Sequence, residues 1–334
     1  MSLHDVTYQH WEGEHHGIWR RRWVIAENGL RSCLDNKWAR HLLLVSWFLC
    51  LVQVAVLFVV GQLLVKDSVV YGLVDQLDSQ WAFLASGLVS WLVDHPEISV
   101  RTTYNILFYF FASHLGFLAM IAIVMVIPHL ITRDLSSQAI IIYSSKAVSR
   151  FDYILGKFGT VFGLLCLIWL GPLVTAWIAG NFLSSDWSFF WHSRIALINT
   201  LIYVLTAMTI LSIVSLGISS LSKKPKATTF FWVVLWLVGN AIRAFGESGR
   251  NPKEYLRNFS ISFNLDQISL AVFNLSEELK LAQDAIPVLG DMLGGLRNSP
   301  FNWFEKPDMG GTSIALTIMV VTAIFILRFR VKPE

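Results

Sequence analysis

The chain has 334 residues, of which 54% are hydrophobic and only 15% are charged. Soluble domains carry roughly 25% charged residues, and 14 Trp and 23 Phe are more large aromatic side chains than a soluble core of this size could bury. The composition therefore excludes an ordinary soluble protein and indicates a membrane protein with several spans. The formal net charge of +3 gives no indication of a nucleic-acid partner.

The N-terminal segment, residues 1–41, precedes the first apolar run. It contains four tryptophans and an arginine triplet, Trp11, Trp19, Trp23, Trp38 and Arg20–Arg22. Tryptophan at headgroup depth and arginine near anionic lipid are typical of an amphipathic helix that lies in the membrane interface. We therefore expect an elbow helix here, on the cytoplasmic surface. The segment lacks the apolar stretch of a signal peptide.

Six apolar runs are long enough to be read as membrane spans, because a hydrocarbon core about 30 Å thick requires about 20 helical residues. They are Leu42–Val65, Tyr104–Ile131, Phe158–Phe182, Ile195–Leu221, Thr228–Ile242 and Ser313–Leu327. Residues 42–334 are thus predicted to form one all-α domain of six transmembrane helices. The stretch Trp81–Val93 is too short to cross; we interpret it as an interfacial or re-entrant helix and leave a seventh crossing open.

Glycine and proline predict two local features of the third span. Gly171 and Pro172 stand near its middle, where proline removes a backbone donor and should kink the helix. Gly159 and Gly163 lie four residues apart near its start and would permit close approach of another helix.

Basic residues between the spans predict the orientation. Segments 1–41, 132–157, 222–227 and 328–334 together carry 16 Lys and Arg against 8 Asp and Glu. The segments on the opposite side carry 10 basic and 15 acidic residues. The basic side is therefore expected to be cytoplasmic, together with both termini.

The longest segment between spans covers residues 243–311, between the fifth and sixth spans, on the side expected to be external. It contains a predicted amphipathic helix at Leu265–Leu281, followed by glycine-rich turns. We expect a small external helical cap, too short to be a catalytic domain.

The sequence excludes several kinds of chemistry in this chain. No predicted span has Asp, Glu, Lys or Arg in its central part, which argues against an ion-coupled carrier. No phosphate-binding P-loop, zinc-protease or serine-hydrolase motif occurs. The N-terminal histidines are interpreted as part of a solvated tail, and His114 as a hydrogen-bonding group to a neighbouring helix rather than a proton relay. We expect no catalytic residue, resident cofactor or metal site.

The first cytoplasmic loop, residues 132–157, has the most distinctive sequence. It begins with charged residues at the end of the second span, continues through the apolar stretch Ala139–Ile142, and returns to the third span with basic residues. A compact helix between two spans can bind a groove on a partner and pass motion to both spans. Because the loop has no chemical motif of its own, we expect it to act mechanically.

This loop resembles that of the permease subunits of type-2 ABC exporters. In that family an Arg-Asp or Arg-Glu pair is followed by small residues, a Pro-Ile-Ser-Arg-like turn and Tyr-x-x-Gly-Lys at the start of the third span. The matching residues are Arg133, Asp134, Ser149, Arg150, Tyr153, Gly156 and Lys157. The chain departs from the family where Ala147 and Val148 replace the expected proline turn. The match covers about 25 residues closely, whereas the resemblance in topology extends over the whole chain.

The resemblance implies a half-transporter in a bacterial inner membrane. Two permease chains, identical or related, would pair with two separate cytoplasmic ATPase subunits that bind Mg-ATP, and would export an amphipathic or lipid-like substrate. The coupling helix would cover roughly Asp134–Lys146. A second contact with the ATPase would lie at Ser222–Ala227, which contains Lys223, Lys224 and Lys226. Ordinary positive-inside topology explains these lysines equally well.

Two alternatives remain open from the sequence. The same assembly could be a mechanical transmitter or assembly platform that acts on an external partner through residues 243–311 without moving a substrate. A membrane enzyme would need ionisable groups clustered at one membrane face. The acidic residues between the first two spans are the nearest candidates, and a solvated external loop explains them better.

Overall fold

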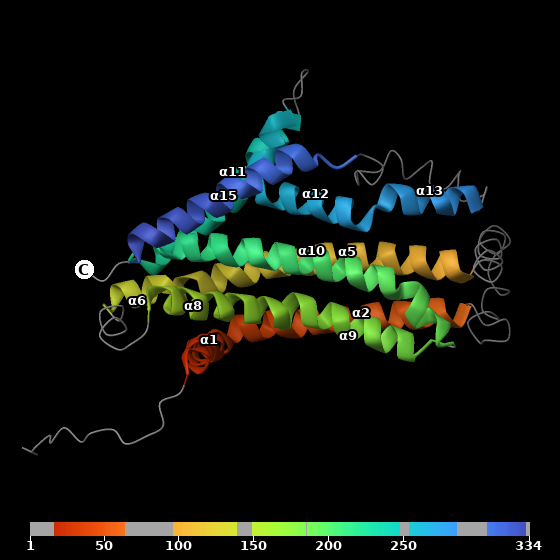
Figure 1. Cartoon of the computed structure of the whole chain (residues 1–334), viewed down its shortest axis with the longest axis horizontal. Coiled ribbons are helices and arrows are strands. Elements are labelled where there is room, and N and C mark those ends of the chain that lie inside the picture. The colour runs from red at the N-terminus through yellow and green to blue at the C-terminus, as the bar shows by residue number, and fades with distance from the viewer. Residues whose placement is uncertain are drawn as a thin grey trace, which may run out of the picture.

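We analysed a computed structural model of the chain, which describes residues 17–63, 96–138, 149–184, 186–247, 254–285 and 306–331. Every regular element in these residues is helical, and none of them forms a strand. The all-α expectation is therefore confirmed for the described part of the chain (Figure 1).

Six helices among the described residues are long and apolar enough to cross a membrane. They cover Lys37–Gln62, Pro96–Ser136, Arg150–Phe182, Ser188–Ser219, Pro225–Glu247 and Met309–Arg330. Each corresponds to one predicted span, so the prediction of a multi-pass membrane protein is confirmed. The stretch Trp81–Val93 lies outside the described residues.

The spanning helices are built from the following elements. They are α2 (Lys37–Leu63); α5 (Pro96–Val126) with η1 (Ile127–His129) and α6 (Ile131–Ser136); α8 (Arg150–Leu165) with the π-helix η2 (Cys166–Leu170) and α9 (Gly171–Phe182); α10 (Ser188–Ser219); α11 (Pro225–Glu247); and α15 (Met309–Arg330). Helices α2, α5, α8–α9 and α10 run along the long axis of the molecule (Figure 1).

The core lies between α5, α10 and the third span. Phe108, Trp169 and Tyr203 are fully or almost fully buried there, and the Trp169 indole N–H donates a 2.9 Å hydrogen bond to the carbonyl of Ala112. Helices α5 and α10 are apolar on all sides, which is typical of membrane-spanning helices whose outer faces would contact lipid.

The third span is interrupted where the Gly-Pro pair predicts it. Pro172 has no N–H to donate to the carbonyl one turn earlier. The chain widens into η2 just before this proline, and the Gly171 N–H donates to the carbonyl of Cys166, five residues back. A π-type bond thus accommodates the proline within a continuous span.

Helix α1 (Ile18–Leu34) lies across the bundle and packs on α8 (Figure 1). The approach is close because α8 offers glycines: a Cβ on Gly159 would lie 2.9 Å from the Cβ of Ala26. The prediction that Gly159 and Gly163 permit close helix approach is confirmed, with α1 as the neighbour. Trp19 and Trp23 are 76% and 68% exposed. A helix is present where the elbow helix is expected; its position at a membrane surface stays a prediction.

The helix predicted at Leu265–Leu281 begins earlier and is divided in two, α12 (Ile261–Phe273) and α13 (Leu275–Ala285). Asn274 separates them in the left-handed conformation, with φ of 47°. Helix α12 packs against α5, α10, α11 and α15, so this apolar part of the segment belongs to the helical bundle. The small external cap expected at residues 243–311 stays a prediction.

Helix α13 is held on the first turns of α5 by a buried carboxylate. Glu278 is 5% exposed, and its Oε1 accepts hydrogen bonds from Arg101 at 2.9 Å (Nε) and 2.6 Å (Nη2). Its other oxygen accepts a hydrogen bond from the Thr102 hydroxyl at 3.2 Å. Nearby, the Asn105 amide donates to the carbonyl of Phe273 at 2.6 Å.

Candidate functional site

The candidate site is the end of the bundle where the first loop leaves α6 and re-enters at α8. Pro128 ends α5, since it cannot continue the hydrogen-bond ladder, and η1 turns the chain into the short helix α6. The turn between α10 and α11 and the C-terminal end of α15 lie at this same end (Figure 1). The described parts of the segments that the sequence assigns to the basic side are therefore gathered together.

Asp134 is the centre of a buried cluster that joins the two sides of the loop. The Tyr153 hydroxyl donates to Asp134 Oδ2 at 2.6 Å, and Lys157 Nζ lies 2.7 Å from the same oxygen. Lys157 also donates to the carbonyl of Leu130 at 3.2 Å. The Asp134 and Lys157 side chains are only 13% and 11% exposed. Tyr153 and Lys157 are four residues apart on α8, so they share a face and reach the same carboxylate.

Ser149 begins α8 as its N-cap. Its Oγ accepts a 3.1 Å hydrogen bond from the Asp152 backbone N–H and donates to the Asp152 carboxylate. The Asp152 carboxylate also pairs with Arg22 of α1, with 2.5 Å between Arg22 Nη2 and Oδ1. Sequence reasoning assigned Arg22 to anionic lipid together with its neighbours, and it gave Asp152 no role. The structure corrects this: Arg22 faces the protein and fixes α1 to the start of α8.

Gly156 is required where α1 crosses α8. A Cβ at this position would lie 2.7 Å from the Ile25 side chain and 3.3 Å from the Arg22 carbonyl oxygen. Cys33 is buried on α1, and its burial raises the pKa of its thiol to about 11, while the positive charge of Lys157 opposes this shift. The crossing is therefore a close, buried contact.

Two of the seven motif residues lie outside these contacts. Arg133 and Arg150 are exposed, and neither forms an ion pair with a described carboxylate. Lys223 and Lys224, at the turn between α10 and α11, and Lys226, in the first turn of α11, are exposed too. The structure thus separates the motif into residues held by contacts within the protein, namely Asp134, Ser149, Tyr153, Gly156 and Lys157, and two exposed arginines.

A second polar cluster joins three spans next to the Asp134 cluster. The Thr132 hydroxyl donates to the Ser219 carbonyl at 2.6 Å and lies 3.0 Å from the Thr228 hydroxyl. Ser219 Oγ accepts from the backbone N–H groups of Ile131 and Thr132 and donates to the carbonyl of Ile127. These contacts satisfy backbone groups that the break at Pro128 leaves unpaired. Sequence reasoning missed this cluster; the position of Pro128 just before Thr132 was the available signal.

The other predicted residues are placed as follows. His114 is exposed, and its Nδ1 lies 2.8 Å from the Phe110 carbonyl on its own helix, not on a neighbouring helix as expected. Only the first five residues of the predicted coupling helix Asp134–Lys146 are described, since 139–148 lie outside the described residues. The N-terminal histidines also lie outside them.

Taken together, the site's contacts hold α1, α6, α8, α10 and α11 in fixed positions around the two points where the first loop begins and ends. This arrangement can transmit a mechanical displacement of the loop into several spans. Comparison of the chain with models of known protein families and with curated proteins gives no match.

Proposed function

We propose that the chain is the membrane-spanning subunit of an ATP-driven transporter related to type-2 ABC exporters, with ATP hydrolysed by separate cytoplasmic subunits. The observation that supports this most directly is the Asp134 cluster. Asp134 stands on one side of the first loop, and Tyr153 and Lys157 stand on the other, yet all three meet in one buried contact. These residues belong to the motif that carries the resemblance to the family.

The geometry suggests how such a subunit would work. An ATPase bound to the loop would push on α6 and on the start of α8. Lys157 and Tyr153 would pass this motion to α8, and Thr132 would pass it to α10 and α11 through Ser219 and Thr228. Closure of the ATPase subunits on Mg-ATP would therefore tilt several spans together. A second permease chain would complete the pathway, through which an amphipathic or lipid-like substrate would leave.

The first test is purification of the tagged chain from native membranes in a mild detergent. We expect an ABC-type ATPase to co-purify in an amount comparable with the chain itself. If the full-length chain is recovered from these membranes without any ATPase, the proposal is contradicted.

The second test measures ATP hydrolysis by that complex in lipid nanodiscs. Tyr153→Phe removes the hydroxyl that contacts Asp134 and keeps the ring, so we expect the ATPase to stay bound while its hydrolysis rate changes. Tyr255→Phe is the matched control, because Tyr255 is 63% exposed and far along the chain from the loop. Equal rates for the wild type and both variants would argue against a coupling role for the cluster.

A further inference from the structure

A cavity of about 760 Å³ lies between α8, α10 and α15, near the end of the bundle that carries the Asp134 cluster. We refer to it as the α8–α10–α15 groove. Its apolar walls include Phe151, Ile154, Phe158, Ile213, Leu216 and Ile324. All three helices are among the membrane-spanning helices, so the groove faces the region where lipid tails would surround the protein.

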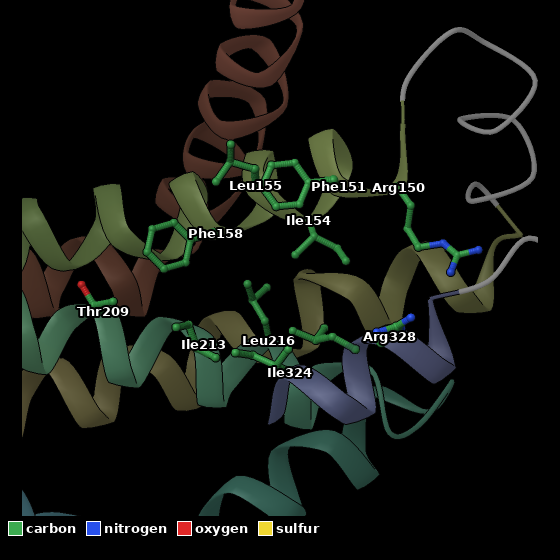
Figure 2. A pocket seen from close by; sticks show the side chains of 11 residues that line it. Arg150, Phe151, Ile154, Leu155, Phe158, Thr209, Ile213, Leu216, Ile324 and Arg328 are labelled. Carbon is green, nitrogen blue, oxygen red and sulfur yellow. The ribbon is translucent and has the colours of Figure 1, made fainter. Parts of the chain in front are cut away.

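Two arginines give the groove a charged end. Arg150 is the first residue of α8, and Arg328 lies in the last turn of α15. Both line the groove, and Figure 2 shows their guanidinium groups at the same end. Among the described residues, neither arginine pairs with a carboxylate, and no acidic side chain lines the groove. Thr209, the other polar lining residue, lies at the opposite end (Figure 2).

We infer that this groove binds an anionic phospholipid, with the phosphate between Arg150 and Arg328 and an acyl chain along the apolar walls. The wall on α8 from Phe151 to Phe158 extends over about 10 Å at the rise of an α-helix, which accommodates the upper part of an acyl chain. The charges are complementary, since guanidinium groups form strong hydrogen bonds with phosphate oxygens. Basic pockets between spans at the cytoplasmic side are known to bind lipid headgroups.

Selectivity should come from the headgroup. Lipid tails in the bulk membrane are as apolar as the groove walls. An acyl chain therefore gains little free energy when it moves from the bulk membrane into the groove. Two arginines that pair with no described carboxylate favour a headgroup with net negative charge over a zwitterionic one. This assignment is independent of the proposed transport function.

The test is a competition between two lipids. The purified protein, in an uncharged detergent, is given equal amounts of dioleoyl phosphatidylglycerol and dioleoyl phosphatidylcholine, and retained lipid is counted by native mass spectrometry. We expect about tenfold more phosphatidylglycerol to be retained. The double variant Arg150→Gln/Arg328→Gln should lose this preference. Arg330→Gln should keep it, because Arg330 is exposed on the last turn of α15 and does not line the groove.

A second pair of variants tests the apolar walls. Ile213→Trp fills the groove and should reduce retention of both lipids, whereas Ile202→Trp, at an exposed position on the same helix, should not. Equal retention of the two lipids by the wild type, or a preference that survives the double arginine variant, would overturn the proposal. Displacement of the lipid by an equal concentration of inorganic phosphate would also overturn it, because the site would then be one for free phosphate and not for a lipid.

Discussion

Replacing Lys157 with methionine removes the ammonium group that contacts Asp134 and keeps a side chain of similar length. The Asp134 carboxylate is then left with the Tyr153 hydroxyl, at a position where its side chain is 13% exposed. Loss of one partner from a buried ion pair costs about 3–5 kcal/mol. Because Asp134 keeps one hydrogen bond and some contact with solvent, we expect the free energy of unfolding to fall by about 3 kcal/mol.

Two further variants, Asp134→Asn and the double variant Asp134→Asn/Lys157→Met, separate the energy of the ion pair from the loss of packing. Asp134→Asn leaves Lys157 with the Leu130 carbonyl, 3.2 Å away. The double variant Asp134→Asn/Lys157→Met contains no unpaired charge at this point, so its cost should be less than the sum of the two single costs. Groups in direct contact show coupling energies of about 0.5–3 kcal/mol, and we expect a value in the upper half of that range.

The measurement is reversible unfolding in mixed micelles of increasing dodecyl sulfate content, followed by tryptophan fluorescence. The matched control is Arg31→Met, which breaks the exposed pair with Glu27, where the two side chains are 74% and 38% exposed. Exposed pairs one helical turn apart contribute about 0.3–0.5 kcal/mol. If Lys157→Met costs no more than Arg31→Met, or if the Asp134 and Lys157 variants are additive, the buried cluster does not stabilise this end of the bundle.

Three further predictions concern the contacts around the bundle. Glu278→Ala removes the carboxylate that pairs with Arg101 and should release α13 from the start of α5. The release should appear as faster deuterium uptake by the backbone amides of residues 275–280. Unchanged uptake would show that packing alone holds α13. Gly156→Ala should lower the free energy of unfolding by about 1–3 kcal/mol, because the added Cβ would clash with Ile25. A second substitution, Ile25→Ala, should restore part of this stability. If the double variant is no more stable than Gly156→Ala alone, the proposed clash is contradicted. Burial raises the pKa of the Cys33 thiol from 9.0 to about 11. Alkylation of this thiol by iodoacetamide at pH 8 should therefore be about 100-fold slower than in the unfolded chain. An alkylation rate equal to that of the unfolded chain would refute the burial of Cys33. Because the unfolded thiol ionises first, this group's contribution to stability is complete below pH 9 and is lost between pH 9 and 11.

The spans could be predicted from the sequence because a lipid environment requires long apolar helices with internally satisfied backbones. Their ends could not. The third span begins at Arg150 and not near Phe158, because hydropathy assigns charged residues to the loop. In the structure, Ser149 caps the helix, and Asp152 and Lys157 are neutralised by Arg22 and Asp134. Because Arg22 and Asp134 supply these opposite charges, the charged residues at the start of α8 can form part of the same helix as the apolar residues that follow.

The sequence motif contains the three residues of the Asp134 cluster, but it does not contain the ion pairs formed between distant parts of the chain. Asp134, Tyr153 and Lys157 lie close in sequence, so a local pattern could mark them together. Arg22 and Asp152 are 130 residues apart, and Arg101 and Glu278 are 177 apart. No local periodicity relates residues at such separations, so these pairs emerge only once the helices are packed. The break at Asn274 had a local signal, since asparagine tolerates the left-handed conformation that ends a helix.

The distribution of polar contacts separates the loop end of the bundle from its apolar interior. At the loop end, Asp152 joins α1 to α8, Asp134 joins α6 to α8, and Thr132 joins α6 to α10 and α11. Hydrogen bonds and ion pairs at this end fix the distances and angles between these helices. The loop end should therefore move as one body, and changes in helix tilt should be taken up further along the spans, where η2 already departs from regular α-helix. A displacement applied to the first loop would then reach α10 and α11 through the contacts of Thr132 with Ser219 and Thr228.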